Sequence, residues 1–249
     1  MVGGTRARGI IPSMNIDDAA LAESLRRLSQ PRDDDGSIVS ALHVVVRACV
    51  DLFGVDGAGV LIADEQDILV YAAASDGPGR LLEQTEAEAG EGPCTEAFVQ
   101  GRVVTSRDVT AEAERWPTLA SAMAEQPVRA VLGTPVLLGG VPVGTLDVYK
   151  SRPHDWDDSE QAALGRYAEI ISTTLGAALQ AHTAGELARQ LQYALDYRVL
   201  IERAVGYLMA KHSLDAVAAF NALRNVARSK RTKIGVVSQQ VLDTGALPA

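Results

Sequence analysis

The spacing of apolar residues changes twice along the chain, and this change restricts the fold more than any other feature. Apolar residues first recur every three or four positions, which predicts helices over residues 15–29 and 37–53. Between residues 57 and 150 the apolar runs become short and are bounded by turn residues, which predicts strands. From Asp157 the helical spacing returns, and no proline interrupts it before Pro248. The pattern therefore predicts an α+β chain in which a mixed region precedes an all-helical one.

The middle region combines antiparallel strands with short helices. Residues 57–63 and 68–75 are apolar runs on either side of four polar residues, which predicts a hairpin. Two later runs meet at Gly139-Gly140, a dipeptide typical of tight hairpins. The remaining predictions are a helical patch at 81–87, a helix from Pro93 to about Gln100, a strand at 102–106, a short helix at 115–125, and paired strands at 128–138 and 141–150.

The C-terminal region predicts a long helix followed by a three-helix module. Asp157 and Glu160 have the spacing of a capping box, which would open the long helix, and Asn15 could cap the N-terminal helix. The predicted boundaries separate an N-terminal helix and linker (1–36), a mixed domain (37–182) and a coiled-coil extension with a helical domain (183–249).

Charge is distributed unevenly between these parts. The formal net charge is −9, from 23 basic and 32 acidic residues. From Glu186 onward the balance is nine basic against five acidic residues, so this tail carries +4 and the remainder −13. A basic module after an acidic one indicates a polyanionic partner for the tail alone, and the alternative is an ordinary solvated face.

Composition narrows the class of protein. Hydrophobic residues make up 47% of the chain, enough for a packed core. No apolar stretch reaches the roughly 18 residues of a membrane span, and the N-terminus lacks the apolar region of a secretory signal. Two cysteines cannot form a disulfide framework or a zinc site. We therefore expect a cytoplasmic protein that neither enters a membrane nor holds a structural metal.

Cys94 is the residue that most suggests redox chemistry. Cys94 would lie in the first turn of the helix that Pro93 opens, where the helix dipole lowers the pKa of a thiol. This placement makes Cys94 a candidate redox sensor, and the alternative is a small residue packed between helix and sheet. The polar segment 154–158 could hold metal ligands but also suits a loop before a capped helix. No acid–base pair or activated nucleophile is evident, so we expect no enzyme.

Residues 37–180 resemble a GAF domain of the kind found in actinobacterial regulators. The resemblance rests on Ser75-Asp76, Leu82-Glu83-Gln84, Gly90-Glu91-Gly92-Pro93-Cys94, Glu96-Ala97-Phe98, Gly101, Asp108, Arg115-Trp116-Pro117, Arg129-Ala130, Pro135 and Gly144-Thr145-Leu146. It implies an antiparallel sheet flanked by helices, with a pocket for an unknown small molecule; no particular cofactor is evident. Candidate pocket or redox residues are Asp76, Cys94, Asp108 and Arg129.

Residues 187–242 resemble an ANTAR domain. The resemblance rests on Arg198-Val199-Leu200-Ile201-Glu202, Ala204, Gly206, Leu208-Met209, Asp215, Ala219-Phe220, Leu223-Arg224, Ala227-Arg228 and Lys233-Ile234. It implies a three-helix bundle that binds tandem hexaloop stem-loops in nascent RNA and so prevents a terminator from forming. Val205, Arg231 and Val236 depart from the family pattern, where Lys, Asn and Asp are common. These departures bear on RNA affinity more than on the fold.

The two resemblances together suggest a homodimeric transcription antiterminator that responds to a signal. A GAF input would alter the long helix and its continuation, and thereby the spacing of two RNA-binding bundles. The residues expected to contact RNA are Arg198, Arg203, Arg224, Arg228, Lys230, Arg231 and Lys233. The alternative is a ligand- or redox-sensing dimer whose ANTAR module contacts proteins instead of RNA.

Overall fold

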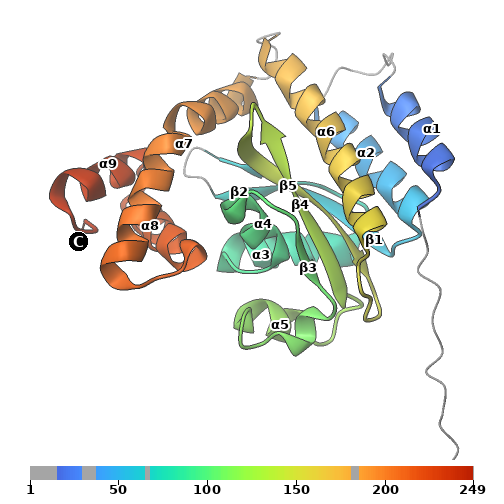
Figure 1. The fold of residues 1–249 in the computed structure, drawn as a ribbon, viewed down its shortest axis with the longest axis horizontal. Helices are drawn as coiled ribbons and strands as arrows, with labels where there is room; N and C mark the ends of the chain where they lie inside the picture. Colours follow the sequence, from blue (N-terminus) through green and yellow to red (C-terminus); the bar gives the residue numbers. More distant parts are fainter. Residues whose placement is uncertain (1–15, 30–37, 65–67, 181–184, 249) are drawn as a thin grey trace, which may run out of the picture.

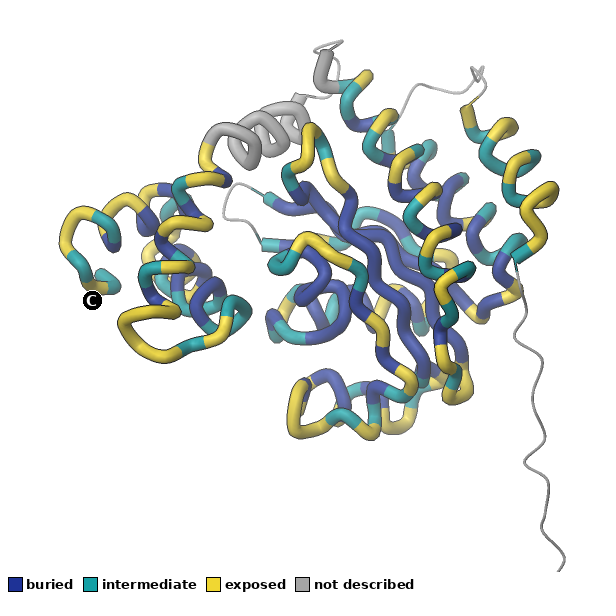
Figure 2. Tube along the Cα trace, in the orientation of Figure 1, coloured by how far each residue is buried: buried dark blue, intermediate teal, exposed yellow. Residues whose placement is uncertain are grey.

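Five strands form one antiparallel sheet in the order β2-β1-β5-β4-β3 (Figure 1). A computed structural model describes residues 16–29, 38–64, 68–180 and 185–248. The strands are β1 (Gly57–Ala63), β2 (Leu69–Ala74), β3 (Val104–Ser106), β4 (Ala130–Leu138) and β5 (Val141–Lys150). The central strand β5 is buried over nearly its whole length because helices cover both faces of the sheet (Figure 2). Both predicted hairpins are present, β1 with β2 and β4 with β5.

One face of the sheet carries the larger hydrophobic core. Helices α2 (Ile38–Phe53) and α6 (Asp158–Gln180) cover this face, and α1 (Asp18–Leu28) packs against both. Alternate residues of the central strands, such as Leu132 and Leu146, meet buried residues of α2 and α6. Asp17 caps α1 by accepting hydrogen bonds from two backbone amides, whereas the predicted cap Asn15 lies outside the described residues.

The opposite face carries shorter elements. They are α3 (Gly77–Ala89), α4 (Pro93–Gln100), the 3-10 turn η1 (Val109–Ala111) and α5 (Pro117–Met123). Helix α3 begins earlier than the predicted patch because Asp76 caps it through the Gly79 amide and Pro78 suits its first turn. These elements enclose a second core around Trp116 and Tyr149.

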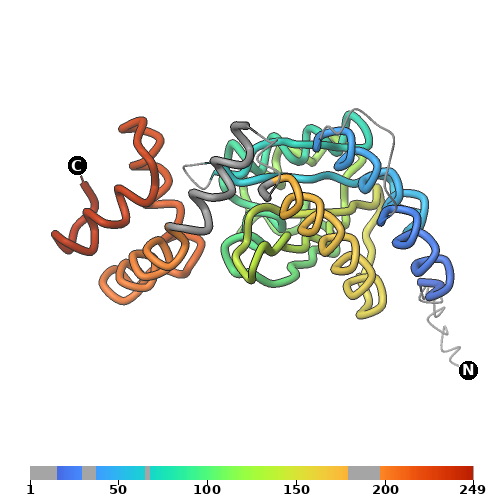
Figure 3. The backbone as a smooth tube through the Cα atoms, turned by 90° about the horizontal axis from the view of Figure 1, so that it is seen from above, coloured from blue at the N-terminus to red at the C-terminus, as the bar shows by residue number. Residues whose placement is uncertain are grey.

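The C-terminal region forms three helices, α7 (Gly185–His212), α8 (Ala216–Lys230) and α9 (Ile234–Thr244). Figure 3 shows this module at one end of the molecule and α1 at the other. Buried residues of the module share one hydrophobic cluster with Cys94 and Phe98 of α4, so the module is docked on the mixed domain. Among the described residues, no helix combines the length and apolar character that a membrane crossing demands.

The predicted capping box is confirmed. The Asp157 amide donates to Glu160 at 3.0 Å, and the Glu160 amide donates to Asp157 at 2.9 Å. The long helix predicted from Asp157 is present as α6, and α7 begins at Gly185, where a glycine could interrupt the helical run. Figure 1 shows the two helices running in different directions, and the residues between them (181–184) lie outside the described residues.

Candidate functional site

Three acidic side chains and a thiol are buried together between the sheet and helices α3 and α4. Glu83 and Glu86 lie one turn apart on α3, Cys94 lies in the first turn of α4, and Asp147 lies in the middle of β5. None of the four is exposed to solvent. Gly59 of β1 makes room for this group, because a Cβ there would lie 1.9 Å from Glu83 Oε1. We call these four residues the acid–thiol cluster.

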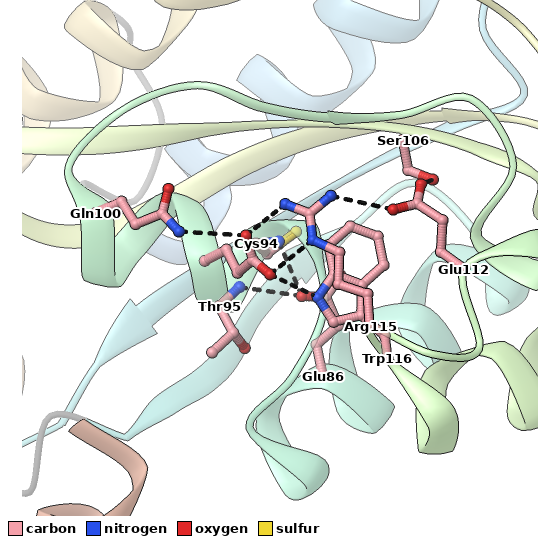
Figure 4. Close-up of polar contacts among 9 residues, drawn as sticks. Glu86, Cys94, Thr95, Gln100, Ser106, Glu112, Arg115 and Trp116 are labelled. Atoms are coloured by element: carbon pink, nitrogen blue, oxygen red, sulfur yellow. Dashed lines mark hydrogen bonds and ion pairs between the residues drawn. The ribbon is translucent and has the colours of Figure 1, made fainter. Parts of the chain in front are cut away.

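Glu86 holds the start of α4. Its Oε2 accepts hydrogen bonds from the backbone amides of Cys94 at 2.8 Å and Thr95 at 3.0 Å (Figure 4). The residue at the N-cap position is Gly92, which has no side chain to do this, so a carboxyl from α3 caps α4 instead. Burial raises the pKa of Glu86 to about 8, although the two amides oppose that shift.

The pKa of Cys94 is shifted in the direction opposite to the one expected from the helix dipole. Burial raises the pKa of the Cys94 thiol well above its usual range, and the nearby carboxyls of Asp147, Glu86 and Glu83 raise it further. The expectation of a lowered pKa is therefore wrong. Cys94 instead packs between helix and sheet, with the backbone of its first turn close to Gly133 of β4.

The other two carboxyl groups of the cluster are shifted in the same direction. Burial raises the pKa of Asp147 to about 6. Burial also raises the pKa of Glu83, and the adjacent charge of Asp147 adds to the effect. The cluster therefore disfavours negative charge on every one of its members.

A separate polar network lies along the outer side of α4. Glu96 accepts from Arg115 Nε at 2.9 Å and from the Trp116 indole at 2.9 Å, and Arg115 stacks 4.2 Å above the Trp116 ring. Arg115 also pairs with Glu112 at 3.0 Å (Figure 4). Glu96 is thereby fully engaged and does not face the acid–thiol cluster as a free charge.

The other three candidate pocket residues have local structural contacts. Asp76 caps α3 and accepts from the Tyr149 hydroxyl at 2.6 Å. Asp108 caps η1 through Thr110. Arg129 donates to four backbone carbonyls between Met123 and Val128, at the end of α5. In the part of the chain that the structure describes, no hydrogen bond joins these three residues to Cys94.

The seven basic residues expected to contact RNA divide into two groups. Arg198 and Arg224 are buried where the C-terminal module meets the mixed domain, at 7% and 4% exposure. Arg203, Arg228, Lys230 and Arg231 are exposed, and Lys233 is half-buried. Four of them (Arg228, Lys230, Arg231 and Lys233) are close in sequence, at the end of α8 and in the turn before α9, where Arg231 has a left-handed backbone with φ of 49°.

Helix α8 is hydrogen-bonded to the C-terminal end of α3. Asn221 Nδ2 donates to the Gly90 carbonyl at 2.8 Å, Arg224 to the Ala89 carbonyl at 3.3 Å and Arg228 to the Glu88 carbonyl at 3.4 Å. These carbonyls have no partner within their own helix, and the negative end of the helix dipole favours cations there. Gly90 suits the contact, because its φ is 71° and a Cβ would lie 1.7 Å from the Arg224 guanidinium.

Helices α4 and α7 add to the same contact. The rings of Phe98 and Phe220 meet edge to face with centroids 6.1 Å apart. Arg198 lies 5.5 Å from the Phe98 ring centroid and pairs with Glu202 at 3.0 Å. Burial lowers the pKa of Arg224, and its Nε atom has no hydrogen-bond partner among the described residues. In the docked module the Arg224 guanidinium therefore has one donor without a hydrogen-bond partner.

Two family models match the chain. A GAF domain model matches residues 37–176, and an ANTAR domain model matches residues 189–242. The chain belongs to the GAF domain family. An ANTAR domain follows the GAF domain, and both are typical of regulatory proteins. No match is found among curated proteins.

Solved structures show the same GAF fold. The free methionine-R-sulfoxide reductase of Neisseria meningitidis, in complex with its substrate, matches with a TM-score of 0.51 and 21% identity, covering 66% of this chain and 95% of the reductase. The GAF domain of an Acinetobacter phosphoenolpyruvate-protein phosphotransferase matches with a TM-score of 0.52 and 18% identity, covering 67% and 95%. A GAF domain from the Coxiella burnetii phosphotransferase gives 0.52 and 18%, covering 66% and 98%. At these identities the likeness shows the fold alone.

The acidic part of the acid–thiol cluster is not predicted from the sequence. Glu83, Glu86 and Asp147 are not among the candidate residues. The signal for Asp147 was present, because an acidic residue between Leu146 and Val148 interrupts a strand that is otherwise apolar. Glu83 and Glu86 carried no such signal, because a short helix with several acidic residues looks like a solvated one.

Proposed function

We propose that this protein is a signal-responsive RNA-binding antiterminator. The GAF domain receives the input, and the ANTAR domain binds stem-loops of nascent RNA as its output. The observation that supports this most directly is the exposed basic group of Arg228, Lys230 and Arg231 at the end of α8, on a module that matches an ANTAR domain. Such a group suits the phosphates around an RNA loop better than a duplex groove.

The proposed target contains two stem-loops, so two ANTAR domains must bind at once. A homodimer supplies them, and the second binding event then becomes intramolecular. The population of the correct dimer would set the apparent affinity for tandem stem-loops, and a monomer would bind a single stem-loop weakly.

The docking of α8 on α3 supports a route from input to output. Arg198, Arg224 and Arg228 all contact backbone carbonyls of the GAF domain, and the first two are buried by that contact. An RNA cannot reach a buried guanidinium. Undocking of the module would free these arginines, so an input that weakens the contact would raise RNA affinity.

The test is binding of the full-length protein to a labelled RNA with two hexaloop stem-loops, over a salt series. A loop-scrambled RNA is the control ligand. We expect loop-dependent binding whose logarithm falls linearly with the logarithm of salt concentration. Replacing Arg228, Lys230 and Arg231 together with alanine should weaken binding and reduce the salt slope by about two, given roughly 0.7 to 0.9 per phosphate contact.

A matched variant separates this effect from net charge. Arg26, Arg102 and Arg152 are exposed residues of the N-terminal helix and the GAF domain, and their joint replacement removes the same charge. That variant should keep the wild-type slope. An equal loss of slope in both triple variants would contradict the assignment of the α8 group.

The burial of Arg198 and Arg224 favours one alternative function. A module that acts through protein contacts would use these arginines to hold its partner domain, as they do in this structure. This alternative predicts that a folded dimer shows no loop-dependent RNA binding, whether or not the module is docked. Loop-dependent binding by a variant with weakened docking would exclude it.

A further inference from the structure

The donor atoms of Glu83, Cys94 and Asp147 converge on one point inside the GAF domain. One carboxylate oxygen from each acid and the Cys94 sulfur all lie within 4.8 Å of one another. The three residues come from three different elements, α3, α4 and β5. Each is at 0% exposure.

No side chain or backbone amide outside the cluster satisfies these groups. All four carboxylate oxygens of Glu83 and Asp147 are buried without a conventional donor among the described residues, and their polar neighbours are each other and the Cys94 thiol. Thr145, two residues before Asp147 and so on the same face of β5, also has a buried hydroxyl without a partner. Buried polar atoms are normally satisfied, because leaving one unpaired costs about 1–3 kcal/mol and more for a charged group.

We propose that Glu83, Cys94 and Asp147 bind a divalent transition-metal ion of the zinc class; the two carboxylates supply the ligands that the cysteine count alone could not, which revises the expectation that the chain has no zinc site. Zinc bonds to sulfur and carboxylate oxygen at about 2.0–2.3 Å, so tetrahedral donors lie roughly 3.4–3.7 Å apart. The cluster reaches that geometry by contracting about 1 Å. A thiolate donor favours zinc, cobalt or iron over magnesium or calcium, which take oxygen ligands.

Charge and neighbouring contacts are compatible with this ion. Metal binding displaces the protons of the three ligands into solvent; the deprotonated ligands then carry three negative charges, and the ion cancels two of them. The N-terminal end of α4, where Cys94 lies, favours the remaining negative charge. Glu86 Oε2 accepts from the amides of Cys94 and Thr95 and so orients the ligand-bearing turn, while its Oε1 is buried without a partner among the described residues; the proposed site takes its three ligands from Glu83, Cys94 and Asp147.

The site is placed where it can influence the ANTAR domain. Its ligands tie α3 to α4, and these are the helices on which α8 docks through Gly90 and Phe98. That the ion acts as the input signal rests on the proposed function. Metal binding itself does not, and it is tested separately.

The test is a titration of metal-free, full-length protein with Co²⁺, whose thiolate complexes absorb in the near ultraviolet. We expect one equivalent of Co²⁺ to produce the thiolate band and Zn²⁺ to abolish it by displacement. The Cys94→Ser variant should lose the band. Cys49 is the matched control, since it is equally buried but lies on α2, against the other face of the sheet, and Cys49→Ser should keep the band.

Two further variants test the site independently if Cys94→Ser fails to fold. Glu83→Gln and Asp147→Asn preserve size and remove charge, and each should weaken Zn²⁺ affinity at least tenfold with an unchanged circular dichroism spectrum. A wild-type protein without a band at millimolar Co²⁺ overturns the proposal, as does a band that all three ligand variants retain. If bound Zn²⁺ does not change the RNA affinity, the metal site is still supported and only its role as the input is refuted.

Discussion

Lys150 and Glu160 form a buried ion pair at one end of the GAF sheet. Their side chains are 8% and 3% exposed, and Lys150 Nζ lies 3.1 Å from Glu160 Oε1. Glu160 also contacts His154 Nε2 at 2.9 Å and accepts the Asp157 amide of the capping box. Removing one partner of such a pair is costly, because the other charge stays buried without compensation.

Glu160→Gln should therefore destabilise the protein by about 3 kcal/mol, measured by urea unfolding. Glutamine keeps the capping-box hydrogen bond, so the loss reports the pairing with Lys150, both its charge and the hydrogen bond that Glu160 Oε1 accepts. The double variant Lys150→Met with Glu160→Gln should recover most of that stability. Glu169→Ala is the control on the same helix, because its pair with Arg166 is exposed and is worth under about 1 kcal/mol. Equal losses in Glu160→Gln and Glu169→Ala would contradict the prediction.

At the scale of single elements, caps determine where the helices begin. Asp215 Oδ1 accepts from the Ala218 amide at 2.7 Å and so caps α8, the helix that carries most of the docking contacts. Asp215→Ala should cost about 1 kcal/mol and should increase hydrogen exchange of the first turn of α8. Asp215→Ser should behave like the wild type, since serine is also a good cap. Unchanged exchange in Asp215→Ala would show that docking alone holds this turn.

Most elements could be predicted from the sequence because their signals are local. The Gly139-Gly140 turn, the box of Asp157 with Glu160, and Pro93 at the start of α4 each depend on residues within a few positions. Helix α3 was placed too short because Gly77 and Gly79 are poor helix formers, and only the Asp76 cap and packing on β1 compensate for them.

The candidate sites could be predicted only in part, because they depend on residues distant in sequence. The raised pKa of Cys94 follows first from burial and then from Asp147, which is 53 positions away and meets it only after the sheet has formed. Arg198 and Arg224 look like surface cations on an amphipathic helix. Their burial follows from a domain contact that no local periodicity encodes.

At the scale of the whole molecule, the proposed function requires that docking of the ANTAR domain compete with RNA for the same arginines. Arg224 is buried against the end of α3 with its Nε unsatisfied, and Arg228 donates to a carbonyl at 3.4 Å. These are weak or imperfect hydrogen bonds, and the apolar contact around Phe98 and Phe220 accompanies them. A domain contact of this kind is compatible with an equilibrium between docked and undocked states, which a small difference in binding free energy can shift.

Asn221 offers a way to perturb that equilibrium without touching a basic residue. Asn221→Asp places a carboxylate against the Gly90 carbonyl, so a 2.8 Å hydrogen bond becomes a contact between two acceptors. Asn225, one turn further along α8, is exposed, and Asn225→Asp adds the same charge without that contact. We expect Asn221→Asp to bind the tandem stem-loop RNA about three- to tenfold more tightly than Asn225→Asp, equivalent to roughly 0.7–1.4 kcal/mol. Hydrogen exchange in residues 88–100 should rise only in Asn221→Asp; equal RNA affinities in the two variants would mean that docking does not restrain the ANTAR domain.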